Sequence, residues 1–218
     1  MLFGCFIQIA KLQNSLLVTR TSKPNQMPRQ KTLNLLKSHV PFNQEEARMT
    51  QETIAFVEAN PNCFERTLEI GHVTGSAWIL DKTKTFTLLT HHRKLDKWFQ
   101  LGGHCDGDSN VLNVALKEAQ EESGLTEISI LSEAVFDVDV HLIPENKGVL
   151  AHYHYDIRFL FEADKSQSVT ISEESKNLNW IKLEEVKSYN NSDSILRMVD
   201  KSSEIRVASV NVYQVESK

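Results

Sequence analysis

The sequence predicts an α/β or α+β layered domain that is preceded by N-terminal helices. Three observations support this fold class: helical spacing of apolar residues over 31–60, short β-rich segments from about residue 70, and one amphipathic helix at 109–124 between two groups of strands. The 218 residues, 40% of them hydrophobic, can bury one sizeable core. We therefore expect one main domain with appended segments.

The first 44 residues contain no Asp or Glu but carry basic side chains. The basic residues are Lys11, Arg20, Lys23, Arg29, Lys31 and Lys37. This composition suits a transit-like or surface-binding leader, or an upstream extension of little structural role with Met27 as an alternative start. The apolar stretch "MLFGCFIQIA" is too short to span a bilayer and lacks the preceding basic region of a secretory signal. We assign residues 1–30 to a basic, flexible extension.

A helical segment is expected at 31–68, after the linker "SKPNQMPRQK". Helices are predicted over 31–40 and 43–60, and Asn60 followed by Pro61 should end the second helix. The main domain then covers 69–205. Its first two strands, 76–80 and 85–91, flank the polar turn "DKTK" as a β-hairpin would.

The rest of the main domain alternates strand and helix signals. The segment "KWFQL" predicts a strand that runs into Gly102 and Gly103, and the helix at 109–124 follows. Strands are expected over 128–143, 151–163 and 178–183, and helices over 183–189 and 192–204. We assign 206–218 to a C-terminal tail.

Charge and cysteine content exclude several functional classes. A formal net charge of −5 argues against a general nucleic-acid-binding protein, which would normally present a basic face. The three cysteines, Cys5, Cys63 and Cys105, show no pair spacing typical of a disulfide framework or structural zinc site. A cytoplasmic location is therefore the default expectation.

The helix at 109–124 carries three glutamates beside its apolar stripe. Glu118, Glu121 and Glu122 fall within about 100° of arc at the edge of the packed face. Such charge runs are usually solvated, but a glycine pair at the end of the preceding strand lets backbone approach a ligand closely. Carboxylates and carbonyls are the ligands of hard divalent cations. Gly124 should end this helix, and Asp108 or Ser109 should cap its start.

The stretch from Gly103 to Leu125 resembles the Nudix box, G-x5-E-x7-R-E-U-x-E-E-x-G-U, where U is aliphatic. Gly103, Glu118, Ala119, Glu121, Glu122, Gly124 and Leu125 match the pattern. The resemblance covers about residues 70–187 and implies a Nudix-like α/β/α sandwich with a mixed sheet. It also implies hydrolysis of a pyrophosphate bond in a nucleoside diphosphate linked to another moiety, with Mg²⁺ or Mn²⁺.

Two positions depart from the box. Ser109 stands where the family has its first glutamate, and Lys117 stands where it has arginine. In the family these two side chains are thought to pair and brace the catalytic helix. Lysine keeps the charge but lacks the planar two-point fork of arginine. Asp108 is the candidate for the missing carboxylate, because Gly107-Asp108 resembles the family's Gly-Glu displaced by one position.

The resemblance also implies roles for individual residues. Glu118, Glu121, Glu122 and the Gly102 carbonyl would hold the metal, which would neutralise the pyrophosphate and orient a water. Glu118 is also assigned to catalysis. The general base would be Glu174, with Glu173 as the fallback; a solvated loop acid is the alternative interpretation of both.

Further side chains near these elements are candidate substrate contacts. His104, Arg93 and His154 could contact phosphate, although packing or exposure is the commoner explanation for such residues; Trp98 could stack on a base or fill the core. His152, His154 and Asp156 should share one strand face. A zinc site could be built from such residues, but the sequence shows no ligand set on a second element.

Two other functions remain as alternatives. One is a Nudix-fold binding or regulatory module with weakened catalysis, which the departures at Ser109 and Lys117 would allow. The other is chemistry like that of isopentenyl-diphosphate isomerase, for which Cys105 is the only nearby thiol. The expected partner is a small phosphorylated substrate. The N-terminal helices would either cap the site or form a homodimer interface.

Overall fold

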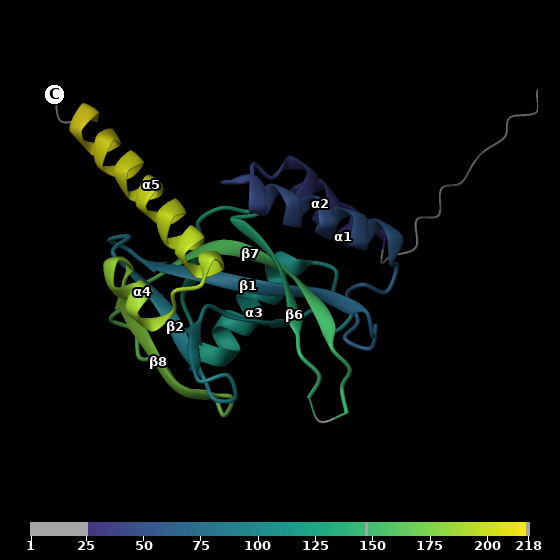
Figure 1. The fold of residues 1–218 in the computed structure, drawn as a ribbon. Helices are drawn as coiled ribbons and strands as arrows, with labels where there is room; N and C mark the ends of the chain where they lie inside the picture. The colour runs from purple at the N-terminus through teal and green to yellow at the C-terminus, as the bar shows by residue number, and fades with distance from the viewer. Residues whose placement is uncertain (1–25, 147, 217–218) are drawn as a thin grey trace, which may run out of the picture.

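A computed structural model describes residues 26–146 and 148–216, with side chains described for 29–146 and 148–205 (Figure 1). Two helices come first, and a sheet interrupted by one helix follows. Two short helical segments and one long helix end the described chain. The elements are α1 (Gln26–Ser38), α2 (Gln44–Ala59), β1 (Gly71–Asp81), β2 (Phe86–His92), β3 (Lys97–Phe99), β4 (Leu101–His104), α3 (Val111–Ser123), β5 (Ile128–Ile130), β6 (Asp137–Ile143), β7 (His152–Ala163), β8 (Ser175–Lys182), η1 (Leu183–Glu185), α4 (Val186–Tyr189) and α5 (Asp193–Glu216). The layered mixed α/β prediction is confirmed.

The sheet is mixed and is centred on the pair β1 and β7, which run parallel. β1 also pairs antiparallel with β2 and β4, so the strand that carries the glycine pair lies directly beside β1. β7 pairs antiparallel with β5 and β6, and β2 with β3 and β8. This topology brings the residues after β4, the start of β7 and the segment before β8 to one region.

Alternation along β1 creates two cores, because successive side chains of a strand point to opposite faces. Ala77 and Ile79 join the cluster that includes α1, α2 and α3, whereas Trp78 and Leu80 join the cluster that includes α4 and α5. Trp78 is fully buried and its indole N–H donates a 2.8 Å hydrogen bond to Ser202 of α5. The sheet is therefore covered by helices on both faces, as the sandwich prediction requires.

Glu46 of α2 joins the N-terminal helices to the rest of the chain. Its fully buried carboxylate accepts hydrogen bonds from His39 (2.8 Å) and from Lys201 of α5 (2.5 Å). It also accepts from the backbone N–H groups of Phe42 and Val138. Because Val138 lies in β6, this one carboxylate connects α2, the sheet and α5.

The predicted strand at 128–143 is wrong in its middle. Residues 128–130 pair with β7 up to Phe161, and pairing resumes at Asp137 opposite Arg158. Six residues, 131–136, thus face only 159–160, so a continuous ladder is impossible. The Nδ1 atom of His39 donates a 3.0 Å hydrogen bond to the Val135 carbonyl, so the loop 131–136 has a partner outside the sheet.

Other expected boundaries also shift. The linker prediction for 22–31 is wrong from Gln26 onward, where α1 already begins. α5 continues to Glu216 through the segment that we expected to be a tail. Residues 1–25 of the expected extension lie outside the described residues, and so do 217–218. In the described part of the chain, each helix is too short or too polar to cross a membrane.

Candidate active site

The acidic helix α3 packs on β1 and β4, which fixes where its glutamates lie. A Cβ at Gly75 of β1 would meet the backbone of Val111 at 2.9 Å, so the absence of a side chain lets α3 approach the sheet closely. A Cβ at Gly103 of β4 would likewise collide with the Glu118 carboxylate. The glycines therefore allow α3 to bring its carboxylates against the backbone of β4.

Glu118 and Glu122 both face this glycine pair. Glu122 accepts a 3.1 Å hydrogen bond from the backbone N–H of Gly102, and Glu118 lies against Gly103. Both side chains are half-buried. α3 ends as predicted, at Gly124 in the left-handed conformation with φ +68°.

Burial and mutual repulsion make these carboxylates hard to ionise. Burial, partly offset by the Gly102 N–H and reinforced by the charges of Glu118 and Glu174, raises the pKa of Glu122 to about 7. Burial and the charge of Glu121 likewise raise the pKa of Glu118. A cation between Glu118 and Glu122 would relieve this repulsion, so the carboxylate oxygens beside the β4 backbone fit a hard divalent ion.

Glu121 occupies a different position from the other two box glutamates. Its side chain is exposed and lies 3.6 Å from Lys117 in an i, i+4 ion pair on the outer surface of α3. The structure thus places Glu118 and Glu122 together against β4 and leaves Glu121 at the rim.

The expected brace between Asp108 and Lys117 is not formed among the described residues. The Asp108 carboxylate instead accepts a 2.8 Å hydrogen bond from the Asn110 backbone N–H, and Lys117 pairs with Glu121. The predicted cap is also wrong. Asn110, not Asp108 or Ser109, occupies the position before α3, and its side chain makes no capping bond.

Ser109 is buried beneath α1 and is not turned toward Lys117. Its backbone carbonyl accepts a 2.7 Å hydrogen bond from Thr32, and its hydroxyl has no hydrogen-bond partner. A glutamate at this position would have to be buried against α1. α1 therefore contacts this loop through the bond from Thr32.

Sequence reasoning missed Arg66, which lies between α2 and β1. Its guanidinium makes two hydrogen bonds to the carboxylate of Asp106 in the box loop. The charges of Glu118 and Glu174 help to raise the Arg66 pKa, after the larger effect of Asp106, so this cation lies near the acidic site. Its position outside the box gave no sequence signal, because lone arginines in loops are usually solvated.

Glu174 lies near the acidic pair, and Arg93 holds its loop. The charge of Glu174 contributes to the raised pKa of both Glu118 and Glu122. Arg93 donates hydrogen bonds to the carbonyls of Glu173 (3.0 Å) and Ser175 (2.7 Å). Its own backbone N–H donates to the Glu174 carbonyl at 2.9 Å. The guanidinium predicted to contact phosphate is therefore engaged with the backbone of this loop.

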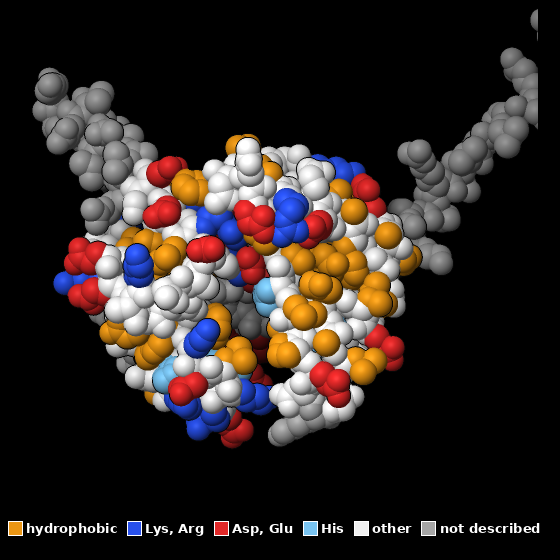
Figure 2. Space-filling view, in the orientation of Figure 1, with side chains coloured by type: hydrophobic (Ala, Val, Ile, Leu, Met, Phe, Trp, Pro, Cys, Tyr) orange, Lys and Arg blue, Asp and Glu red, His pale blue; other side chains and the backbone are white. Residues whose placement is uncertain are grey.

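His104 and His154 lie together on the other face of β4. Their ring centroids are 5.1 Å apart, and both rings lie close to His72 of β1. Burial and the neighbouring His104 charge lower the pKa of His154 to about 2, and burial lowers the pKa of His104. Both imidazoles are therefore neutral at pH 7. Figure 2 shows a hollow in the viewed face of the molecule, with histidine surface at its edge.

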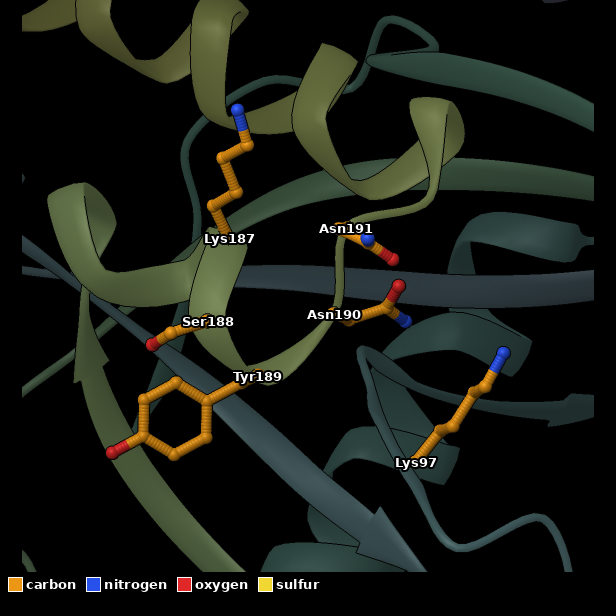
Figure 3. A pocket seen from close by; sticks show the side chains of 6 residues that line it. All are labelled: Lys97, Lys187, Ser188, Tyr189, Asn190 and Asn191. Carbon is orange, nitrogen blue, oxygen red and sulfur yellow. The ribbon is translucent and has the colours of Figure 1, made fainter.

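Trp98 lies apart from the glutamates. It stacks on His91 with 5.0 Å between ring centroids, meets Tyr189 edge-on and packs against the second core. A pocket of about 220 Å³ lies beside it, with Lys97, Asn190 and Asn191 around its opening (Figure 3). This volume is below the range of typical ligand sites, and none of the predicted site residues lines the pocket.

Cys105 does not support the isomerase alternative. Its thiol is buried, and that burial raises its pKa well above the usual range, so a reactive thiolate is not favoured. Cys63 is also a buried free thiol.

Comparison with known proteins places the chain in a family. The family model described as NUDIX domain matches residues 72–200. The crystal structure of a C. elegans Ap4A hydrolase binary complex is 19% identical, with TM-score 0.52, and the alignment covers 62% of this chain and 98% of that one. A NUDIX family hydrolase from Clostridium perfringens is 21% identical over 62% of this chain and 97% of that one, with TM-score 0.45. The comparison with curated proteins found no match. Since the family model spans more than half of the chain, the protein belongs to the Nudix family and is a pyrophosphohydrolase of the Nudix type.

Proposed function

We propose that this pyrophosphohydrolase cleaves the pyrophosphate bond of a nucleoside diphosphate linked to another moiety, with Mg²⁺ or Mn²⁺. One observation carries the proposal: Glu118 and Glu122 converge on Gly102–Gly103 with Glu174 close by. These carboxylates and the Gly102 carbonyl offer the oxygen ligands that hard cations prefer, and Glu121 could complete the set from the rim. A bound divalent ion would neutralise the pyrophosphate charge and position a water.

The protein's own groups would then move the proton. Glu174 would accept it from the attacking water, because its carboxylate is exposed on the loop yet close to Glu118 and Glu122. Arg93 would hold that loop through its carbonyl contacts. Neutral His104 and His154 could donate hydrogen bonds to phosphate oxygens. We also propose a cytoplasmic location, since Cys63 and Cys105 are free thiols.

A substrate screen tests this function. NDP-sugars, dinucleotides, coenzyme A and nucleoside triphosphates would be incubated with Mg²⁺ or Mn²⁺, and the nucleotide products would be separated and quantified by chromatography, because cleavage of the pyrophosphate bond leaves both products phosphorylated. We expect metal-dependent turnover of at least one class, and a drop of about 10²-fold or more in kcat for Glu122→Gln. Absence of turnover on every class would favour the binding-module alternative, and full activity of Glu122→Gln would refute the metal assignment.

A second pair of variants tests the general base. Glu174→Gln should lower kcat by about 10²- to 10⁴-fold with little change in substrate affinity. Glu173→Gln changes the same charge one residue away, where the carboxylate is exposed, and should leave kcat near the wild-type value. The opposite pattern would identify Glu173 as the general base. Full activity of both variants would mean that a glutamate of the Nudix box serves as the base.

A further inference from the structure

Three histidines from two strands converge on one face of the sheet. His72 of β1 stands opposite His154 of β7 in the parallel register, and His152 lies two residues earlier on the same face. One ligand atom from each of these three side chains can be chosen so that all lie within 4.8 Å of one another. β1 therefore supplies the metal-ligating histidine on a second strand that the sequence did not reveal.

The separation of the nearest nitrogens matches a shared metal. Nε2 of His72 and Nε2 of His154 are 3.1 Å apart. Two imidazole nitrogens bound to one tetrahedral zinc at about 2.0–2.1 Å would be separated by about 3.3 Å. The same distance also suits a hydrogen bond between one protonated and one unprotonated nitrogen, so the distance alone does not choose between the two.

A contact behind His152 prepares its ring for coordination. Its Nδ1 lies 2.8 Å from the Leu150 carbonyl, which can only accept, so Nδ1 carries the proton and Nε2 keeps its lone pair. Metal-bound histidines typically donate their second nitrogen to a carbonyl or carboxylate in this way. His141, whose ring lies 5.5 Å from that of His154, shows the same arrangement with Asp139 at 3.0 Å.

Burial disfavours the charged form of two of these imidazoles, His72 and His154. Burial, with smaller effects from neighbouring histidines, lowers the pKa of His72 to about 4 and that of His154 to about 2. Neutral imidazoles are ligands for transition metals. Imidazole also discriminates against Mg²⁺, which prefers oxygen.

We propose that His72, His152 and His154 form a second metal site, selective for Zn²⁺ or a similar transition-metal ion. Three protein ligands leave a fourth position open for water or a substrate oxygen, as in catalytic rather than structural zinc sites. The site is separate from the hard-cation site at Glu118 and Glu122, and it does not depend on the proposed hydrolytic function.

Zinc binding to the full-length protein tests the proposal. Isothermal titration in millimolar Mg²⁺ would be performed on the wild type and on the double variant Glu118→Gln/Glu122→Gln, which removes the competing carboxylates. We expect about one Zn²⁺ per chain in both proteins. X-ray absorption at the zinc edge of the double variant should show imidazole neighbours. This measurement does not rely on any histidine substitution.

Single histidine variants locate the ion. His152→Gln and His154→Gln should weaken zinc binding by more than about 100-fold, since loss of a direct ligand should exceed the 10- to 100-fold effect of outer contacts. His91→Gln, a histidine that pairs with Asp96 away from the cluster, is the matched control and should bind as wild type does. Absence of zinc binding, wild-type binding by both cluster variants, or only oxygen neighbours in the absorption spectrum would each overturn the proposal. If the wild type binds zinc as expected but turns over no substrate in the screen described above, the hydrolytic proposal alone would be refuted.

Discussion

Thr32 donates a 2.7 Å hydrogen bond from its hydroxyl to the backbone carbonyl of Ser109. Both residues are buried, and the bond joins α1 to the loop that begins the Nudix box. The chain has no glutamate at Ser109 to hold this loop, and an upstream helix contacts it instead.

The Thr32 bond should stabilise the fold measurably. Thr32→Val keeps the shape of the side chain but leaves a buried carbonyl without its donor, so it should lower the free energy of unfolding by about 1–3 kcal/mol. Urea unfolding measures this loss. Thr126→Val, at an exposed threonine, should change it by less than about 0.5 kcal/mol. Equal effects of the two substitutions would show that the bond does not hold the loop.

Restoring the family's glutamate at Ser109 should be harmful. Ser109→Glu would bury a carboxylate without a partner under α1, so we expect a loss of about 3 kcal/mol or more and no gain in kcat. Ser109→Ala removes a hydroxyl that already lacks a partner and should stay within about 1 kcal/mol of wild type. Thermal unfolding and initial rates measure both. A stable Ser109→Glu enzyme with raised kcat would contradict this account.

Arg66 should matter more for activity than for stability. The Arg66–Asp106 pair is more than half exposed, so Arg66→Ala should cost at most about 1 kcal/mol in unfolding free energy. Because its charge lies near Glu118 and Glu174, kcat/KM should fall by about tenfold or more. Arg48→Ala removes a comparably exposed arginine with two ion pairs and should leave kcat/KM unchanged. Equal kcat/KM values of the two variants would show that Arg66 does not contribute to the activity of the site.

Arg93 can be tested as a positioning residue. Arg93→Lys keeps the charge but lacks the planar fork whose two nitrogens donate to the Glu173 and Ser175 carbonyls, so the Glu174 loop should loosen. We expect kcat to fall with little change in KM, and a weaker response of kcat to Glu174→Gln in this background. A raised KM with unchanged kcat would restore the phosphate contact predicted from the sequence.

Glu46 should make stability depend on acid pH. Burial opposes its ionisation, but hydrogen bonds from His39, Lys201 and the Phe42 N–H outweigh burial and lower its pKa to about 2. A lowered folded-state pKa means that the unfolded chain binds the proton first. The stabilisation, about 3 kcal/mol, is therefore present above pH 4.5 and lost as pH falls toward 2.

Unfolding titrations at several pH values would measure this dependence. Glu46→Gln should be less stable than wild type at pH 7, and the difference should shrink below pH 4. Glu52→Gln, on the exposed side of the same helix, should differ from wild type by at most about 0.5 kcal/mol throughout. A constant difference between Glu46→Gln and wild type across this pH range would show that the carboxylate does not titrate as described.

Local sequence patterns determined much of this protein. Helix periodicity located α2 and α3, the polar turn "DKTK" located the β1–β2 hairpin, and Gly124 ended α3 as expected. The spacing of the box identified the family, because side chains three and four residues apart share one helix face. These features depend only on neighbours within a turn or a strand.

The tertiary structure decided which of those residues act together. The sequence offers Lys117 two possible partners, Glu121 and Asp108. The folded loop decides between them, because it turns the Asp108 carboxylate to the Asn110 backbone N–H and leaves Lys117 to pair with Glu121. Arg66 and Thr32 reach the box from outside it, and the parallel register of β1 and β7 brings His72 to His154. Contacts between distant segments depend on how sheet and helices pack, so periodicity could predict the acidic helix but not the groups that surround it.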